Sequence, residues 1–426
     1  MEISNNAKQL SPNFLTVEEV WGRNAYPVRP SPGSRGGGGS VDGSGAEIRL
    51  PMFSRFGQRF AQIPLCQAHN RGIRARDLKF GLFSSHRLQA DHSLFTLTTS
   101  TSIVLVLVYV DDILIAGNDL SQIEIFKKIL STHFKTKDLG SLKYFLGLEV
   151  ARSSTGIFLN QRKYALDILS DNGQLGARTA LFPMEQHLKL TTQDGNLLPD
   201  PGLYRRLVGR LIYLTITRPD IVYAINTLSQ FMHAPRVPHM TATIRVLRYI
   251  KGCLGQGIFF PSSNNTHVSA YTDSDWASYP TTRRSTTGYF IQLGTSPISW
   301  RTKKQSTVSR SFAEAEYRAM AVTTCELTWL KQLLTDLGVP HPEPFTLHCD
   351  NQSALHIAHN PVFHERTKHI EIDCHIIRDK IRSGLLKAVH TSSTEQLADI
   401  FTKALGHDLF HHFSRKLGIT DLHAPT

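Results

Sequence analysis

Three short apolar stretches follow one another closely in the C-terminal half of the sequence. They read THVSAYTDSD (266–275), TTGYFIQLG (286–294) and SPISWRTK (296–303). Each is rich in β-branched and aromatic residues and is bounded by Gly, Pro, Ser or Asn, which is typical of strands joined by turns. Consecutive strands with short connections pair in an antiparallel manner, so we expect a three-stranded meander here.

Beyond this meander, helical and strand patterns alternate. The predicted elements are a long helix from Ser311, a strand FTLHCD (345–350), helical pieces from Asn351 and from about Glu365, a strand LLKAVHTS (385–392) and a final helix TEQLADIFTKAL (394–405). Strands that alternate with helices run parallel, with the helices on the faces of the sheet. The sequence therefore predicts an α/β (α+β) fold, in which parallel strands extend the meander.

The middle of the chain predicts a second region. Two apolar strands, SIVLVLVYV and ILIAG, meet at the adjacent Asp111 and Asp112. A helix over 121–134, the strands KYFLGLEVARS and GIFLNQ, and helices over about 161–175 and 202–250 are expected next. The Gly- and Ser-rich stretch KGCLGQGIFFPSSNNT near residue 255 indicates a domain boundary.

The first 85 residues contain the flexible tract PSPGSRGGGGSVDGSG and no lasting helical or strand period. We expect these residues to be disordered or unassigned to a domain, and no function is assigned to them. The predicted division is 1–85 unassigned, 86–260, 261–420 and a tail, 421–426.

Composition limits the class of partner. The chain has 426 residues, enough for two or three domains, and a formal charge of +12, which favours nucleic acid or an acidic membrane surface. A basic protein that binds nothing charged is the alternative. The five scattered cysteines, without a CxxC pair, indicate reduced thiols in the cytoplasm or nucleus rather than a secreted protein. No signal peptide or membrane anchor is visible, because the apolar run at 103–116 is too short and is interrupted by aspartates.

Four acids stand at or near the ends of the predicted C-terminal elements: Asp273, Glu316, Asp350 and Asp399. Oxygen donors that converge without Cys or His at ligand spacing favour Mg²⁺ or Mn²⁺. Two such ions would support hydrolysis of a phosphodiester. Taken singly, each acid is equally compatible with a helix cap or a solvated side chain, and only the joint arrangement favours metal binding.

Two neighbouring acids have to be distinguished from this set. Ser311 and Glu314 fit a capping box at the start of the long helix, so we choose Glu316 for catalysis. Asp275 lies on the same strand face as Asp273, and it either assists that residue or starts a turn.

Longer motifs indicate a family. The segments YTDSDWA, RRSTTGY, ISWRTKKQSTVSRS, EAEYRAM, CDNQSA, NPVFHERTKHIEID and QLADIFTK, from about Ser269 to Gly418, resemble the RNase H domain of copia-type LTR retrotransposon Pol polyproteins. The resemblance implies a ribonuclease H fold. It also implies that Asp273, Glu316, Asp350 and Asp399 bind divalent metal and cleave RNA paired to DNA.

The stretch around LVYVDDILIAGND resembles the palm, thumb and connection of the reverse transcriptase of the same family. There the paired aspartates, here Asp111 and Asp112, hold metal ions near the primer end. The family also requires a third aspartate and the fingers further upstream, and Asp77 lies too close to Asp111 to supply this part. We therefore expect a vestigial polymerase metal site that does not catalyse.

Basic side chains provide the expected contacts with nucleic acid, which would position a duplex without reading its sequence. Solvated helix faces are the alternative explanation. The predicted residues are Arg205, Arg206, Arg210, Arg245, Arg248, Lys251, Arg283, Arg284, Lys303 and Lys304. A zinc site formed by His364, His369, Cys374 and His375 is disfavoured, because Cys374 falls on an apolar helical stripe.

The leading hypothesis is a Pol fragment whose RNase H domain hydrolyses the RNA of RNA–DNA hybrids with Mg²⁺ or Mn²⁺. The alternative is an inactive transposon remnant that binds nucleic acid only by charge. The sequence makes no prediction about the oligomeric state.

Overall fold

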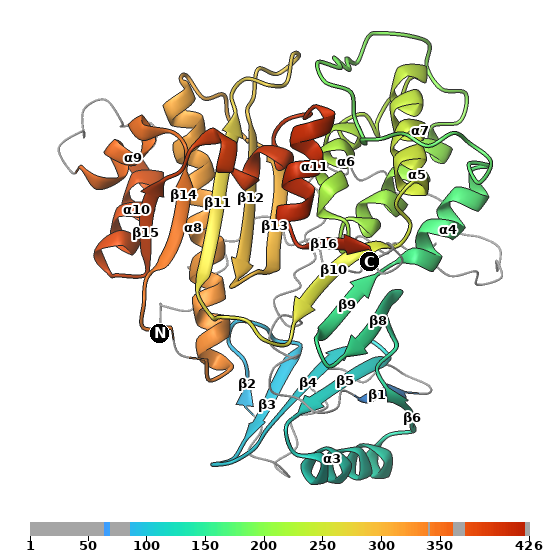
Figure 1. The fold of residues 1–426 in the computed structure, drawn as a ribbon, viewed down its shortest axis with the longest axis vertical. Helices are drawn as coiled ribbons and strands as arrows, with labels where there is room; N and C mark the ends of the chain where they lie inside the picture. Colours follow the sequence, from blue (N-terminus) through green and yellow to red (C-terminus); the bar gives the residue numbers. More distant parts are fainter. Residues whose placement is uncertain (1–63, 69–85, 340, 361–370, 422–426) are drawn as a thin grey trace, which may run out of the picture.

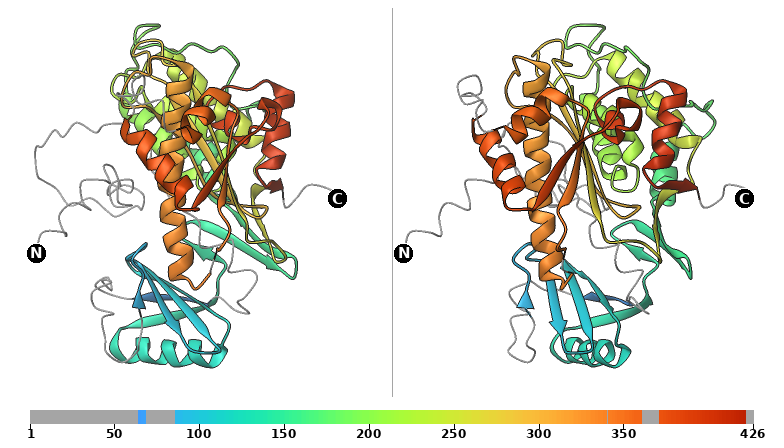
Figure 2. Two further views of the ribbon diagram at one scale, coloured as in Figure 1. Left: turned by 90° about the vertical axis from the view of Figure 1, so that its left-hand side faces the viewer. Right: turned by 60° about the vertical axis from the view of Figure 1, so that its left-hand side comes forward.

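The computed structural model describes residues 64–68, 86–339, 341–360 and 371–421, and within these residues it forms three β-sheets with helices around them. Figure 1 shows the first sheet and helix α3 at one end of the molecule, the second sheet in the middle, and the third sheet beside helices α4–α7 at the other end. Figure 2 shows that the long helix α8 runs along the third sheet and reaches the first. At that contact, the Trp329 indole donates to Ala90 O at 2.9 Å.

The first sheet carries the predicted hairpin. Strands β4 (Ile103–Tyr109) and β5 (Asp112–Gly117) pair in an antiparallel manner, and α3 (Leu120–His133) covers one face. Val104 packs toward α3, whereas Leu105 belongs to a core shared with the second sheet. Because both faces are covered, the hairpin is a nearly continuous apolar run. The strand order is β2-β3-β4-β5-β1-β6, with β2 (His86–Arg87), β3 (Leu94–Thr98) and β6 (Thr136–Ser141).

Strand β1 (Pro64–Ala68) lies in the segment for which the sequence predicts no regular structure. It pairs antiparallel with β5 and β6, with Cys66 opposite Ile113 on one side and opposite Asp138 on the other. These five residues thus form a strand in a segment where the sequence shows no strand period. Five residues are too few to display a period, and their partners are distant in sequence, so the local pattern gives no signal.

The second sheet joins three distant parts of the chain. In the order β16-β10-β9-β8-β7, its strands are β16 (Ile419–Asp421), β10 (Gln256–Pro261), β9 (Gly156–Asn160), β8 (Leu148–Ser153) and β7 (Tyr144–Phe145). β10 lies in the stretch that predicts a domain boundary. Gly257 permits its pairing with β9, because a Cβ there would lie 2.2 Å from Leu159 O. On its other edge β10 pairs with β16, which lies beyond the expected boundary near residue 260. The division into domains stays a prediction.

Helices α4–α7 pack around one core, together with the short 3-10 helix η1. Their bounds are α4 (Arg162–Asp171), α5 (Pro201–Leu214), η1 (Pro219–Ile221), α6 (Val222–Ser229) and α7 (Val237–Lys251). The pattern predicted over 202–250 is therefore three α-helices. α5 ends at Leu214, and the connection to η1 contains Arg218, whose buried guanidinium donates to Asp220 Oδ2 at 2.7 Å and to Cys253 O at 3.0 Å. The next residue, Pro219, has no N–H to continue the helix.

The third sheet confirms the predicted fold class. Its order is β13-β12-β11-β14-β15, with an antiparallel β11–β12–β13 meander and with β14 and β15 parallel to β11. Tyr289 and Ile291 face α8, while Phe290 faces the core of helices α4–α7. The bounds are β11 (Val268–Asp275), β12 (Thr286–Leu293), β13 (Ser296–Lys304), α8 (Phe312–Asp336), β14 (Phe345–Cys349), α9 (Gln352–His359), α10 (Glu371–Arg382) and β15 (Leu386–His390).

The prediction of an α-helix over 394–405 is wrong. In place of an α-helix over 394–405, the structure has two 3-10 helices, η3 (Ser393–Glu395) and η4 (Leu397–Phe401), and α11 (His407–Lys416) follows. Gln396 fixes this geometry: its amide donates to Thr272 O at 3.0 Å and its oxygen accepts from the N–H of Ala398 at 3.2 Å. A buried polar side chain that bonds to a neighbouring strand thus overrides the helical pattern.

Candidate functional site

The structure brings the four predicted acids together. Carboxylate oxygens of Asp273, Asp350 and Asp399 all lie within 4.8 Å of one another. Glu316 joins them through a second group, in which its carboxylate, the carboxylate of Asp350 and the thiol of Cys349 are equally close. Asp350 therefore belongs to both groups. Asp275, the last residue of β11, belongs to neither.

Sheet topology explains why these acids meet. β11 and β14 run parallel, with Tyr271 opposite His348. Two residues further along each strand come Asp273 and Asp350, at the carboxyl edge where α/β sheets build their sites. On the facing element, η4 carries Asp399. Gly288 of β12 allows η4 to approach, since a Cβ there would lie 2.6 Å from Thr402 Cγ2.

Glu314 and Glu316 have different surroundings. Ser311 caps α8 by accepting from the N–H of Glu314 at 3.2 Å. A capping box would have Glu314 accept from the N–H of Ser311, but Glu314 instead accepts from the N–H of Arg310 at 2.8 Å. It also pairs with Arg318 at 2.9 Å. Glu316 points instead toward β11, where its Oε1 accepts from the N–H of Ser274 at 3.1 Å.

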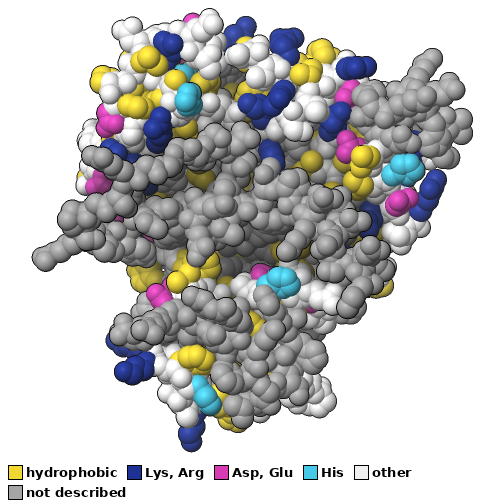
Figure 3. Space-filling view, turned by 180° about the vertical axis from the view of Figure 1, so that it is seen from behind, with side chains coloured by type: hydrophobic (Ala, Val, Ile, Leu, Met, Phe, Trp, Pro, Cys, Tyr) yellow, Lys and Arg dark blue, Asp and Glu magenta, His cyan; other side chains and the backbone are white. Residues whose placement is uncertain are grey.

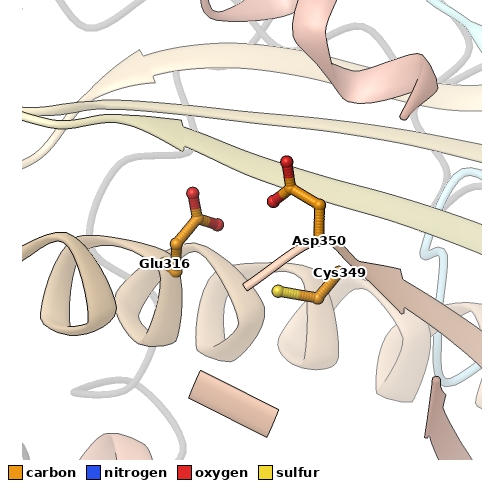
Figure 4. Close-up of side chains that lie close together, drawn as sticks. All are labelled: Glu316, Cys349 and Asp350. Carbon is orange, nitrogen blue, oxygen red and sulfur yellow. The ribbon is translucent and has the colours of Figure 1, made fainter. Parts of the chain in front are cut away.

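One oxygen of the cluster has no hydrogen-bond partner in the part of the chain that the structure describes. Glu316 is 6% exposed, and its Oε2 is buried without a hydrogen bond. Desolvating a carboxylate oxygen without compensation costs on the order of 1–3 kcal/mol or more. Figure 4 shows the Glu316 and Asp350 carboxylates turned toward each other. This oxygen is therefore available to a cation between the two acids.

A lysine that sequence reasoning missed lies inside the cluster. Lys403 Nζ is 3.0 Å from Asp399 Oδ1 and 3.5 Å from Asp273 Oδ2, and Thr402 Oγ1 donates to Asp273 Oδ2. Two like unit charges 4.8 Å apart repel by roughly 3.5 kcal/mol at an effective dielectric constant of about 20. Lys403 offsets part of this repulsion. Its position four residues after Asp399 was the available signal.

The environment opposes ionisation of the acids. Burial raises the pKa of Asp273, although Lys403 and Thr402 act against it. Burial, together with the charges of Asp273 and Asp350, holds the pKa of Glu316 well above its usual range. Burial and Asp273 raise the pKa of Asp399 to about 7. Several acids that resist ionisation in one place are typical of sites that bind cations.

The donor set fits a hard divalent cation. Mg²⁺ and Mn²⁺ prefer carboxylate oxygens, which all four acids supply. The unpartnered Oε2 of Glu316 and the group of three aspartates are the features that such an ion would satisfy. Cys349, immediately before Asp350, adds a sulfur that the sequence analysis did not include. It is fully buried at the end of β14.

The paired aspartates of the hairpin have different surroundings. Asp112 starts β5 opposite Tyr109, and Val110, with a φ of 50°, forms the turn with Asp111. Asp111 is exposed and Asp112 half-buried. Among the described residues, neither belongs to a group of three possible ligands. Asp77 lies outside the described residues. In Figure 1, the carboxyl end of β11 points away from the sheet that holds this hairpin.

Many of the predicted nucleic-acid contacts are bound within the protein. Arg205 donates to Met232 O at 2.7 Å, Arg210 pairs with Asp171 at 2.6 Å, and Arg245 pairs with Glu185 at 2.9 Å. Arg206 lies 3.6 Å from Asp200, Lys251 donates to Ala177 O, and Lys304 lies over the Tyr279 ring. Of the remaining predicted residues, Arg248 and Arg283 are exposed, and Arg284 and Lys303 are half-buried. Figure 3 shows Lys and Arg side chains spread over the upper part of the face it presents. Binding to phosphate stays a prediction for all of them.

The disfavoured zinc site gains no support. Cys374 is 2% exposed in the core beneath α8, as the apolar stripe predicts, and His375 is exposed. His364 and His369 lie outside the described residues. Cys253, Cys325, Cys349 and Cys374 are free thiols. Within the described ranges, no helix has both the length and the apolar character needed to cross a bilayer.

Comparisons with known proteins agree with the sequence resemblance. Residues 70–186 match the family described as reverse transcriptase (RNA-dependent DNA polymerase). The chain is 47% identical over 330 residues to the retrovirus-related Pol polyprotein from transposon RE2 of Arabidopsis thaliana, covering 78% of this chain and 23% of the polyprotein. It thus spans about a quarter of the length of that relative.

Two further matches cover nearly the whole of the other protein. An uncharacterized mitochondrial protein of Arabidopsis thaliana is 44% identical over 223 residues, which are 52% of this chain and 92% of that protein. A solved N-terminal RNase H domain from Mycobacterium tuberculosis, fused to maltose binding protein, aligns with 35% of this chain and 98% of its own at 10% identity and a TM-score of 0.24.

The reverse transcriptase match, the long identity to a transposon polyprotein and the order of motifs along the chain all point the same way. The chain belongs to the family of copia-type retrotransposon Pol polyproteins.

Proposed function

We propose that the C-terminal region hydrolyses the RNA strand of RNA–DNA hybrids with the help of Mg²⁺ or Mn²⁺. The observation that carries this proposal is the convergence of Asp273, Glu316, Asp350 and Asp399 from four different elements onto one edge of the third sheet. The alternative roles of these acids, as helix caps or solvated side chains, would not require the four side chains to converge.

The residues divide the work as follows. Asp273, Asp350 and Asp399 would hold one ion, and Glu316 with Asp350 would hold a second. Bound divalent ions activate water and neutralise charge on the leaving oxygen in phosphodiester hydrolysis. The Ser274 N–H fixes one oxygen of Glu316 and leaves the other free for a ligand. Thr402 fixes Asp273 Oδ2, and Ser393 fixes Asp350 by donating to its Oδ2 at 2.9 Å. These bonds orient the acids before any substrate arrives.

We further propose that this chain does not polymerise DNA. Asp111 and Asp112 have no third carboxylate beside them among the described residues, and at the turn of the hairpin Asp111 is exposed and Asp112 half-buried. We also keep the division into an unassigned start, a partial reverse transcriptase over 86–260 and an RNase H-like domain over 261–420 as a proposal, with nucleic acid as partner and the cytoplasm or nucleus as location.

The test is cleavage of a labelled RNA–DNA hybrid by the whole chain in Mg²⁺, with EDTA as control. We expect cleavage that Asp273→Asn reduces on the order of 1,000-fold, because a metal ligand supports several kcal/mol of transition-state stabilisation. Unchanged cleavage in Asp273→Asn would refute the assignment. Salt-sensitive binding of hybrid without any turnover would instead support the alternative, an inactive remnant that binds by charge.

A further inference from the structure

The thiol of Cys349 lies beside the proposed magnesium site and has no part in it. Its Sγ and the carboxylate oxygens of Glu316 and Asp350 all lie within 4.8 Å of one another. Figure 4 shows the sulfur directed toward the helix that carries Glu316. The group therefore offers one soft and two hard donor atoms to a single cation.

We propose that Glu316, Cys349 and Asp350 form a binding site for a thiophilic divalent cation, Zn²⁺ or Cd²⁺, which blocks the nuclease by taking oxygens away from the magnesium set. The binding of the cation stands by itself, whereas its inhibitory effect rests on the proposed nuclease function.

The distances suit such an ion. Zinc binds sulfur at about 2.3 Å and carboxylate oxygen at about 2.0–2.2 Å, so tetrahedral ligand atoms are roughly 3.5 Å apart. The three atoms, which lie within 4.8 Å of one another, would approach to this separation on binding. Half-buried Asp350 lies at the solvent side, and water can supply the fourth ligand.

The donor atoms are held only weakly by the protein. Glu316 Oε2 is buried without a partner in a side chain that is 6% exposed. The sulfur has only long contacts with Asn351, whose N–H donates to Sγ at 3.4 Å and whose oxygen is 3.9 Å from it. An incoming cation therefore displaces little. The thiol proton passes to water as the metal–sulfur bond forms.

Ligand softness gives the selectivity. Mg²⁺ gains nothing from sulfur, whereas thiolate selects zinc and similar soft cations. Since Asp350 belongs to both groups, a soft cation beside Cys349 withdraws that carboxylate from the three-aspartate group. A buried core thiol without metal affinity is the competing explanation, since Cys349 also packs in the core of the third sheet.

The experiment uses the whole chain with Cys66→Ser and Cys325→Ser, so that the thiols that remain are the buried Cys253, Cys349 and Cys374. Cd²⁺ is the probe, because a cadmium–thiolate bond has an ultraviolet charge-transfer band. We expect one equivalent of Cd²⁺ to produce this band and Cys349→Ala to abolish it. The concentration of Zn²⁺ that halves hybrid cleavage should rise at least tenfold in Cys349→Ala. Binding of Mg²⁺, measured by calorimetry, should change less than threefold.

The outcomes separate the two proposals. A band that persists in Cys349→Ala, or no band in the background variant, overturns the soft-cation site. A band that depends on Cys349 in a protein that never cleaves hybrid supports the site and refutes the nuclease. Thermal melting by circular dichroism checks that Cys349→Ala is folded, and Cys349→Ser replaces it if it is not.

Discussion

Two regions of this molecule place acidic side chains at the ends of strands, and they differ in every respect that matters for binding a metal. In the third sheet, Asp273 is 1% exposed and its neighbours arrive from other elements. In the first sheet, Asp111 and Asp112 are adjacent on one hairpin and reach solvent. Solvent stabilises the second pair, whereas the first group is left with mutual repulsion and little water. Convergence from separate elements, together with desolvation, distinguishes a cation site from a charged turn.

The convergence of the acids in the third sheet can be disturbed without substituting any of them. Gly288→Ala places a methyl group 2.6 Å from Thr402 Cγ2, which pushes η4 and Asp399 away from β12. We expect a loss of about 1–3 kcal/mol of stability from overpacking and roughly a 10- to 100-fold loss of hybrid cleavage. Urea denaturation and cleavage assays measure the two effects. Gly209→Ala in α5 is the matched control, because a Cβ there meets nothing within 4 Å. Normal cleavage by Gly288→Ala would show that the position of η4 is not required.

Lys403 sharpens the comparison, because it gives the buried group a counter-charge of its own. We expect Lys403→Met to bind Mn²⁺ about tenfold more tightly, a difference of about 1.4 kcal/mol, since an ammonium 3.0 Å from Asp399 no longer competes. Electron paramagnetic resonance of free Mn²⁺ gives the affinity, and Lys403→Arg keeps the charge as control. Weaker binding in Lys403→Met would mean that the lysine assists the ion.

The buried group should also respond to pH. Burial and Asp273 raise the pKa of Asp399 to about 7, against about 3.9 in the unfolded chain. Between these values the folded state holds a proton that the unfolded state has lost, so stability falls as pH rises from about 4 to about 7. We expect the melting temperature in EDTA to drop by a few degrees over this window, and to drop less in Asp399→Asn. Equal slopes in both proteins would contradict this.

The hairpin provides the smallest expected effect. Asp111→Asn with Asp112→Asn should change hybrid cleavage and Mn²⁺ affinity by less than twofold, and neither protein should extend a primer. Both acids lie outside the groups of possible ligands among the described residues, and solvent already screens them. Primer extension by the original chain, abolished in the double variant, would show that the hairpin is a working polymerase site.

What sequence reasoning recovers depends on whether a signal is local. The start of α8 was predictable because Ser311 caps it within one turn, and β11–β13 because short turns join strands with apolar patterns. The convergence of the four acids was predictable from their places at element ends and from the family resemblance. Strand β1 and the 3-10 form of η4 were not predictable, because contacts with residues distant in sequence determine them. Neither were Cys349 and Lys403, whose importance comes only from their neighbours in space.

The pairing of β16 with β10 has a consequence for how this chain is made. Residues 419–421 complete a sheet whose other strands were synthesised more than a hundred residues earlier. Until the ribosome has passed Asp421, β10 keeps an open edge that can recruit strands from other chains. A premature stop just before Ile419 would leave all four acids in place and still yield a protein prone to aggregation. The strand β16 therefore contributes to solubility rather than to chemistry.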